Sequence, residues 1–321
     1  MMQCTALRAK PWNMETKGMV RRVIVFDQVK KFLGGNLVLD IADLQIPKGS
    51  IYGLIGANGA GKSTMMRLIS GVYTVDSGLL TVDGENITDN AAVKEKMFFV
   101  PDDPYFLPQT TMEEMTEFYQ CYYPDFDTVL YEQLMASFEL PSKNKISSYS
   151  KGMRRQAILL LALASNPKYL LLDESFDGVD PVMRQRLRRV MIDIAADKEI
   201  TVVISSHNLR ELDEFCDRVG VLYHGGLLYD ITLDRLKEEV HKYQLAFSEP
   251  VAKEAFSRFR LLSCDITGKF VTLVIRGERQ VLERKIGDLK PLAVEEFPLS
   301  LEEIFIYEMG AKGYDYKDIF A

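Results

Sequence analysis

Residues 56–64 read GANGAGKST and match the pattern G-x-x-x-x-G-K-[ST], which marks a loop that binds phosphate groups. The fixed positions of the pattern are occupied by Gly56, Gly61, Lys62 and Ser63. An apolar run at residues 51–55 precedes the loop, and an amphipathic segment at residues 64–70 follows it. A glycine-rich turn that arose by chance would lack this strand and helix, so the sequence predicts binding of a nucleoside triphosphate.

The residue types in this loop suit an anionic ligand. Glycine lets backbone N–H groups approach phosphate oxygens closely, and a helix that starts near Lys62 points its free amides at the same anion. Lys62 adds a full charge, and the Ser63 hydroxyl is placed to ligate Mg²⁺. We expect the whole loop to contact the triphosphate, that is Gly56, Ala57, Asn58, Gly59, Ala60, Gly61, Lys62, Ser63 and Thr64.

The composition is that of an ordinary folded protein. Of 321 residues, 47% are hydrophobic and 26% charged, which suits one large domain or two smaller ones. The longest apolar run, residues 157–164, falls far short of the ~20 residues of a membrane-spanning helix. The first residues lack the apolar core of a secretory signal, and residues 1–21 are expected to form a flexible tail. A net charge of −7 argues against nucleic acid as the main partner.

Four cysteines are scattered along the chain without metal-ligand spacing. They are Cys4, Cys121, Cys216 and Cys264. We therefore expect reduced and mostly buried thiols, as in a cytosolic protein.

Predicted strands and helices alternate up to residue 230, which indicates a parallel sheet covered by helices. Strands are expected at residues 23–26, 37–44, 50–55, 79–82, 97–100, 169–172, 200–205, 219–223 and 227–229. Helical spacing of apolar and aromatic residues at 111–123 and 129–138 predicts a mostly helical insertion over about 102–166, with the aromatic stripe in the core. A basic helix is predicted at 181–196, and a solvated face is the favoured interpretation of its Arg184, Arg186, Arg188 and Arg189.

Residues 231–321 are expected to form a small α+β extension after a charged helix at 233–240. The expected order is a strand at 243–247, a helix at 251–259, strands at 262–266 and 270–275, and a helix at 279–289.

A second chemical signal is the segment YLLLDE at residues 169–174, a buried strand that ends in two acids. Asp173 suits the Mg²⁺ shell, and Glu174 is placed to polarise an attacking water. Alone, such a strand end is as often a capping carboxylate as a catalytic one. Its position downstream of a phosphate loop favours catalysis.

Residues 149–153, which read YSKGM, lie between these two motifs and resemble the signature of ATP-binding cassette (ABC) ATPases. The resemblance covers about residues 22–230 and implies a P-loop α/β core with an N-terminal antiparallel β subdomain and a helical insertion. It implies that Phe32 stacks on adenine, that Asp180 faces a partner cassette, and that His207 contacts the γ-phosphate. The signature residues Ser150, Lys151, Gly152 and Met153 would bind the ATP held by the opposite subunit.

Three positions depart from the family pattern. Asp102 stands where the family usually has glutamine, and this shorter acid is expected to reach Mg²⁺ through water. Ser175 replaces the proline that normally follows the catalytic glutamate, and Met153 replaces the terminal glutamine of the signature. None of the three removes a group that hydrolysis needs.

The resemblance implies the ATP-hydrolysing, Mg²⁺-dependent subunit of an exporter for drugs, lantibiotics or small amphipathic peptides. Such a subunit dimerises with itself or with a related cassette and drives a separate transmembrane permease from the cytoplasmic face of the membrane. Nucleic acid is not an expected partner. The alternatives are a non-transport ABC ATPase and a regulatory module that binds ATP without turnover.

The loop at residues 102–108 carries two aromatic residues where a surface loop is normally polar. Tyr105 and Phe106 either anchor a helix of the permease or tuck under the helical insertion. The sequence leaves both possibilities open.

Overall fold

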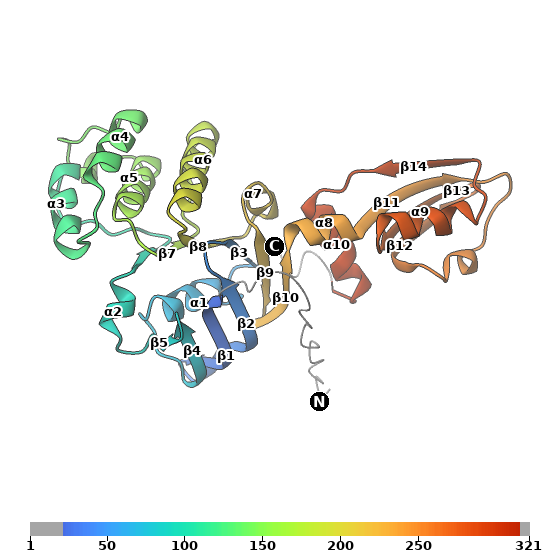
Figure 1. Ribbon diagram of the computed structural model, residues 1–321, viewed down its shortest axis with the longest axis horizontal. Helices are drawn as coiled ribbons and strands as arrows, with labels where there is room; N and C mark the ends of the chain where they lie inside the picture. Colours follow the sequence, from blue (N-terminus) through green and yellow to red (C-terminus); the bar gives the residue numbers. More distant parts are fainter. Residues whose placement is uncertain (1–21, 315–321) are drawn as a thin grey trace.

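The computed structural model describes residues 22–314, so the predicted tail at 1–21 lies outside the described residues. The strands form two sheets, and Figure 1 shows the smaller one set off to one side of the larger. The larger sheet has ten strands in the order β5-β4-β1-β2-β10-β9-β3-β8-β7-β6. None of the helices between residues 22 and 314 combines the length and the apolar composition of a transmembrane span.

One end of the large sheet is antiparallel. β1 (Arg22–Leu33) pairs with β2 (Asn36–Pro47) on one side and with β4 (Ser77–Val82) on the other, and β5 (Glu85–Asn86) continues this end. The turn at residues 34–35 closes the first hairpin with two glycines at φ angles of 57° and 82°, which other residues rarely adopt. Both hairpin strands are longer than predicted. β1 continues past the apolar run at residues 23–26 on which its prediction depended, and β2 extends by one residue at its start and three at its end.

The other end of the large sheet is parallel. Its strands are β3 (Ile51–Ile55), β8 (Thr201–Ser206), β7 (Tyr169–Asp173) and β6 (Met97–Val100). Every residue of β3, β7 and β8 is buried, as expected for strands covered on both faces. β9 (Arg218–Tyr223) runs parallel to β3, and β10 (Gly226–Thr232) links this half to β2. The carboxyl ends of β3, β7 and β8 therefore meet at one edge of the sheet.

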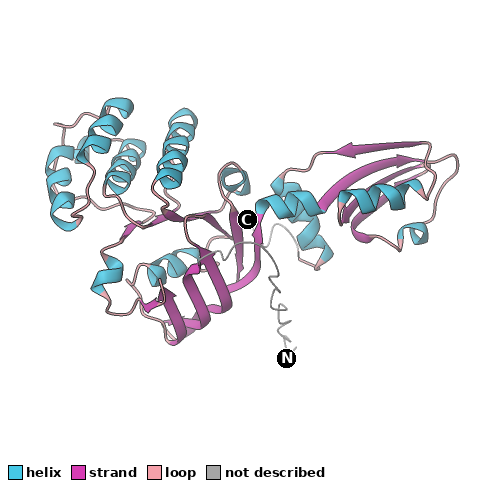
Figure 2. Cartoon of the chain, in the orientation of Figure 1, coloured by secondary structure: helices cyan, strands magenta, loops and turns pink. Residues whose placement is uncertain are grey.

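The predicted helical insertion is present above this edge (Figure 2). Its helices are α3 (Met112–Tyr122), α4 (Thr128–Phe138) and α5 (Lys151–Ala164), and a 3-10 turn at Ile146–Ser148 leads into the last. A capping box between Thr111 and Glu114 starts α3. Part of the aromatic stripe packs on the sheet, since the ring of Tyr119, like that of the following Tyr123, lies close to Phe98, at 5.2 and 5.3 Å. The core prediction is wrong for Tyr122, which is 63% exposed, because helical spacing does not tell how much of a helix face its neighbours cover.

Further helices flank the sheet. They are α1 (Lys62–Ile69), α2 (Ala91–Lys94), α6 (Pro181–Asp197) and α7 (Leu209–Asp213). The predicted solvated face of α6 is wrong for Arg188, which is buried and pairs with Glu211 and Glu214 beside α7. These two acids, in α7 and directly after it, supply the counter-charge for Arg188, and the sequence of α6 alone does not show them.

The residues after α8 (Leu233–Glu239) form the smaller sheet, in the order β12-β13-β11-β14. Its strands are β11 (Val240–Ala246), β12 (Arg260–Thr267), β13 (Phe270–Arg276) and β14 (Ala293–Phe297), and α9 (Arg279–Gly287) covers one face. The helix predicted at 251–259 is wrong, since only Lys253–Phe256 forms a 3-10 turn. One turn suffices to bury Phe256, and β12 begins four residues later.

Helix α10 (Leu301–Ala311) was not predicted from the sequence, and neither was β14. A capping box between Ser300 and Glu303 starts α10. Its buried Leu301, Ile304 and Phe305 belong to the same core cluster as the parallel strands. This helix therefore packs the C-terminal extension against the larger part of the molecule.

The cysteine prediction holds only in part. Cys216 is buried and Cys264 partly buried, whereas Cys121 is exposed on α3, and Cys4 lies outside the described residues. Cys121 lies near the end of α3, and helical spacing alone did not separate the exposed positions of this helix from the buried ones.

Candidate nucleotide-binding site

The loop between β3 and α1 has the shape that phosphate binding requires. Gly61 has a φ of 108°, a conformation that favours glycine. At Gly56 a Cβ would lie 2.4 Å from the carbonyl oxygen of Leu222, so only glycine fits there. Helix α1 starts at Lys62 without a side-chain cap, which leaves its first-turn amides available to an anion.

The Lys62 side chain is buried and folded back over this loop. Its Nζ donates to the carbonyl oxygens of Gly56 at 2.7 Å and Ala57 at 3.2 Å. The same ammonium lies 3.4 Å from Glu174 Oε1, at the end of β7. The Lys62 ammonium thus connects the phosphate loop with the predicted catalytic acid, although the two residues lie far apart in the sequence.

The acids at the end of β7 have different surroundings. Asp173 is 2% exposed, and its Oδ1 accepts a hydrogen bond of 2.5 Å from the Ser205 hydroxyl. Ser205 Oγ in turn accepts the backbone N–H of Glu174 at 3.0 Å. No sequence motif indicates this role of Ser205, because its contact depends on the pairing of β7 with β8.

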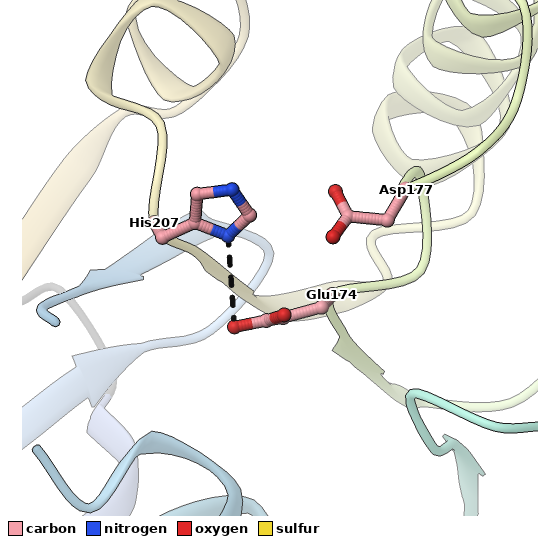
Figure 3. Close-up of side chains that lie close together, drawn as sticks. All are labelled: Glu174, Asp177 and His207. Carbon is pink, nitrogen blue, oxygen red and sulfur yellow. Dashed lines mark ion pairs between the residues drawn. The ribbon is translucent and has the colours of Figure 1, made fainter. Parts of the chain in front are cut away.

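Figure 3 shows three side chains that converge at the mouth of the site. His207 Nδ1 lies 3.8 Å from Glu174 Oε1, so the end of β7 and the loop after β8 meet here. Asp177 points toward the same space, and ligand atoms of the three residues lie within 4.8 Å of one another. Sequence reasoning missed Asp177, which lies in the loop after β7 without a motif of its own.

A cavity of about 250 Å³ lies between the phosphate loop and Glu174. It is lined by Val38, Asn58, Gly59, Gly61, Lys62, Ser63, Thr64, Asp102 and Glu174. Asp102, which stands where the family usually has glutamine, thus lies beside the phosphate loop. Phe32 is 44% exposed on β1 and does not line this cavity.

The signature residues lie apart from this cavity. Ser150 caps α5 by accepting the N–H of Met153 at 3.2 Å, while Lys151 is exposed. Asp180 caps α6 in the same way, accepting the N–H of Met183 at 3.0 Å. The structure therefore does not bring Ser150, Lys151, Gly152, Met153 or Asp180 to the chain's own phosphate loop.

A larger cavity, of about 1220 Å³, lies in the C-terminal extension. Its walls carry cations and acids that neutralise each other, as in the pairs Arg235–Glu239 and Arg279–Glu296. It contains no glycine-rich loop like residues 56–64, so the smaller cavity is the candidate site for a nucleotide.

Comparison with known proteins supports this assignment. A family model described as ABC transporter matches residues 39–177. The ABC transporter ATP-binding protein YtrB of Bacillus subtilis is 35% identical over 290 residues, which cover 90% of this chain and 99% of that protein. The bacitracin transport ATP-binding protein BcrA of Bacillus licheniformis is 29% identical over 69% of this chain and 73% of its own length.

The fold is shared with solved ATP-binding cassettes. A structure described as the ATP binding subunit of an ABC transporter has a TM-score of 0.62 at 25% identity, over 67% of this chain and 92% of that chain. A dimeric cassette in a post-hydrolysis state, bound to ADP and phosphate, has a TM-score of 0.59 at 20% identity, over 65% of this chain and 98% of that chain. Together with the geometry of the site, the sequence relatives identify the chain as a member of the ATP-binding proteins of ABC transporters, which are ATPases.

Proposed function

We propose that this ATPase powers the export of an antimicrobial peptide or a drug through a separate transmembrane permease. The observation that carries the catalytic part is the shared cavity, in which Lys62 Nζ lies 3.4 Å from Glu174 Oε1. The class of cargo is inferred from relatives named as bacitracin and lantibiotic transport ATP-binding proteins.

In this proposal, oxygens of the triphosphate replace the loop carbonyls as acceptors for the Lys62 ammonium. The ammonium and the α1 amides hold the phosphates, and Glu174 accepts the proton of a water whose oxygen attacks the γ-phosphorus. The bond to the β–γ bridging oxygen breaks, and ADP leaves with phosphate. His207 contacts the γ-phosphate, and the exposed Phe32 is free to stack on adenine.

The residues of the site fit Mg²⁺. Asp173 is a buried carboxylate that forms no salt bridge to any residue within 22–314, and a cation would balance its charge. The Ser63 hydroxyl and the Asp102 carboxylate line the adjoining cavity and add hard oxygen donors. Bound Mg²⁺ would neutralise the phosphate charge during hydrolysis. We propose that Ser63 and Asp173 hold it, with Asp102 acting through water.

The second ATP contact would come from another cassette. ABC cassettes dimerise and act with membrane permeases. We propose that residues 150–153 close over the ATP of the opposite subunit, with Asp180 beside them. The position of these residues away from the chain's own cavity supports this arrangement. A second copy of this chain or a related cassette would both complete the site.

We further propose that the chain lies at the cytoplasmic face of the membrane, held there by its permease. Tyr105 is 72% exposed beside the cavity residue Asp102 and offers an anchor for a permease helix. Phe106 is partly buried against the core, so we assign it to packing instead. The ATPase domain would comprise residues 22–230, and residues 231–321 would form the extension.

Substitution Glu174→Gln tests the catalytic assignment. Removing a positioned base lowers turnover by ~10²–10⁴, while ATP binding should persist because the phosphate loop is intact. A fluorescent ATP analogue measures binding, and phosphate release measures turnover. Turnover within about threefold of wild type would show that Glu174 is not the base.

The same substitution addresses the two alternatives. With ATP, the trapped Glu174→Gln dimer should bring its permease down from detergent-solubilised membranes, as a non-transport ATPase would not. Wild-type protein that binds ATP without releasing phosphate would instead favour a regulatory module.

A further inference from the structure

Glu174 has a backbone conformation that residues with side chains rarely adopt. Its φ angle is 45°, in the left-handed region. Three partners hold its peptide groups: its N–H donates to Ser205 Oγ at 3.0 Å, and its carbonyl oxygen accepts from Asp177 N at 3.2 Å and from Arg155 Nη1 at 2.6 Å. A strained conformation persists only when its surroundings over-determine it in this way.

Arg155 is an unexpected member of this set. It comes from α5, five residues after the signature residue Ser150, and is 4% exposed. Among residues 22–314, no carboxylate pairs with its guanidinium, and its Nε is buried without a hydrogen-bond partner. Burial of an unpaired charge is costly, so an apolar side chain would serve packing better. The hydrogen bond to the carbonyl of Glu174 accounts for a charged residue at this position.

The helix that carries Arg155 touches the loop after Glu174 at a second point. A Cβ on Gly152 would lie 3.0 Å from the carbonyl oxygen of Gly178, so the two backbones approach closely there. The first two turns of α5 thus contact the segment around Glu174 both at its start and at Arg155. A displacement of the signature end of this rigid helix would reach the Glu174 peptide directly.

We propose that Arg155 is a positioning residue: it ties the signature helix to the backbone carbonyl of Glu174 and thereby orients the Glu174 side chain. This inference rests on the proposed function, in which Glu174 is the base and residues 150–153 bind the opposite subunit's ATP. When the signature residues bind the ATP of the opposite subunit, Arg155 would then fix the position of the Glu174 peptide. The Glu174 carboxylate acts on the other ATP, which is held by its own phosphate loop. Arg155 thereby links the two nucleotide sites of the dimer.

The test compares turnover, ATP binding and cooperativity in the full chain. Arg155→Met should lower kcat by about tenfold to a hundredfold, the effect of a slightly misplaced catalytic group. The dissociation constant of a fluorescent ATP analogue should stay within about twofold, and the Hill coefficient for ATP should fall toward one. Arg155→Lys, which can donate to the same carbonyl, should recover part of kcat. Arg189→Met, which removes an exposed arginine from α6, should change none of the three quantities.

A double variant separates this inference from the assignment of the base. If Arg155 acts through Glu174, Arg155→Met should not slow Glu174→Gln further, because no base remains to be positioned. An Arg155→Met protein with wild-type kcat, beside an inactive Glu174→Gln, would overturn the role of Arg155 alone. So would equal slowing of both backgrounds. An active Glu174→Gln would overturn the base and the inference together. If Arg155→Met does not fold, Arg155→Gln, whose amide is too short to reach the carbonyl, replaces it in each comparison.

Discussion

The joint between the C-terminal extension and the large sheet contains a buried ion pair whose loss should be costly. Glu308 of α10 is 4% exposed, and its Oε1 lies 3.2 Å from Nη2 of Arg276 on β13. Its Oε2 accepts the Tyr229 hydroxyl of β10 at 3.1 Å. The pair is not aligned as a hydrogen bond, so charge neutralisation accounts for most of its effect.

Substitution Glu308→Leu would leave the Arg276 guanidinium buried with a weaker partner. Breaking a buried pair from one side costs ~3–5 kcal/mol of the free energy of unfolding. Glu239 remains, but at 3.7 Å from Arg276 Nε it compensates only in part. We therefore expect the lower end of the range, about 3 kcal/mol, which corresponds to a fall in Tm of about 6–12 °C at ~2–4 °C per kcal/mol.

Urea and thermal unfolding followed by circular dichroism would measure this loss. The double variant Arg276→Met with Glu308→Leu removes both charges and should return to within about 1 kcal/mol of wild type. Glu302→Leu is the matched control on α10, because its pair with the exposed Arg210 should contribute no more than ~1 kcal/mol. A loss below about 1 kcal/mol in Glu308→Leu, or a double variant as unstable as the single one, would refute this account.

Three further predictions concern the site and its surroundings. Asp102→Ala should raise the Mg²⁺ concentration for half-maximal ATPase activity while Asp102→Gln stays active; an unchanged metal dependence would leave Asp102 as an ordinary loop carboxylate. Tyr105→Ala should change the free energy of unfolding by no more than ~0.5 kcal/mol yet abolish recovery of the permease, whereas Phe106→Ala should cost roughly half of the ~3–5 kcal/mol of a fully buried aromatic. Recovery of the permease by a folded Tyr105→Ala protein would contradict the docking role. Thiol labelling mapped by mass spectrometry should modify Cys121 in the native protein and Cys216 only after unfolding. Burial hides the Cys216 thiol and raises its pKa well above its usual value. Rapid labelling of Cys216 in the native protein would argue against the observed packing.

The sequence by itself determined the phosphate loop, the acidic end of β7 and the α/β class of the core. These features are local, because a strand, a glycine-rich loop and a helix start follow each other within about twenty residues, and each has its own periodicity or residue pattern. The fully buried strands β3, β7 and β8 were readable for the same reason, as continuous apolar runs.

Only the tertiary structure decided which distant side chains share the site and which charges are buried. Ser205 reaches Asp173 because β8 pairs with β7, and Arg155 reaches Glu174 because α5 packs beside that strand end. The burial of Arg188 depends in the same way on two acids from another part of the chain, one in α7 and one directly after it. A helical or strand period reports which face of an element is apolar, but the partner of a polar group is set by neighbours in space that no local pattern encodes.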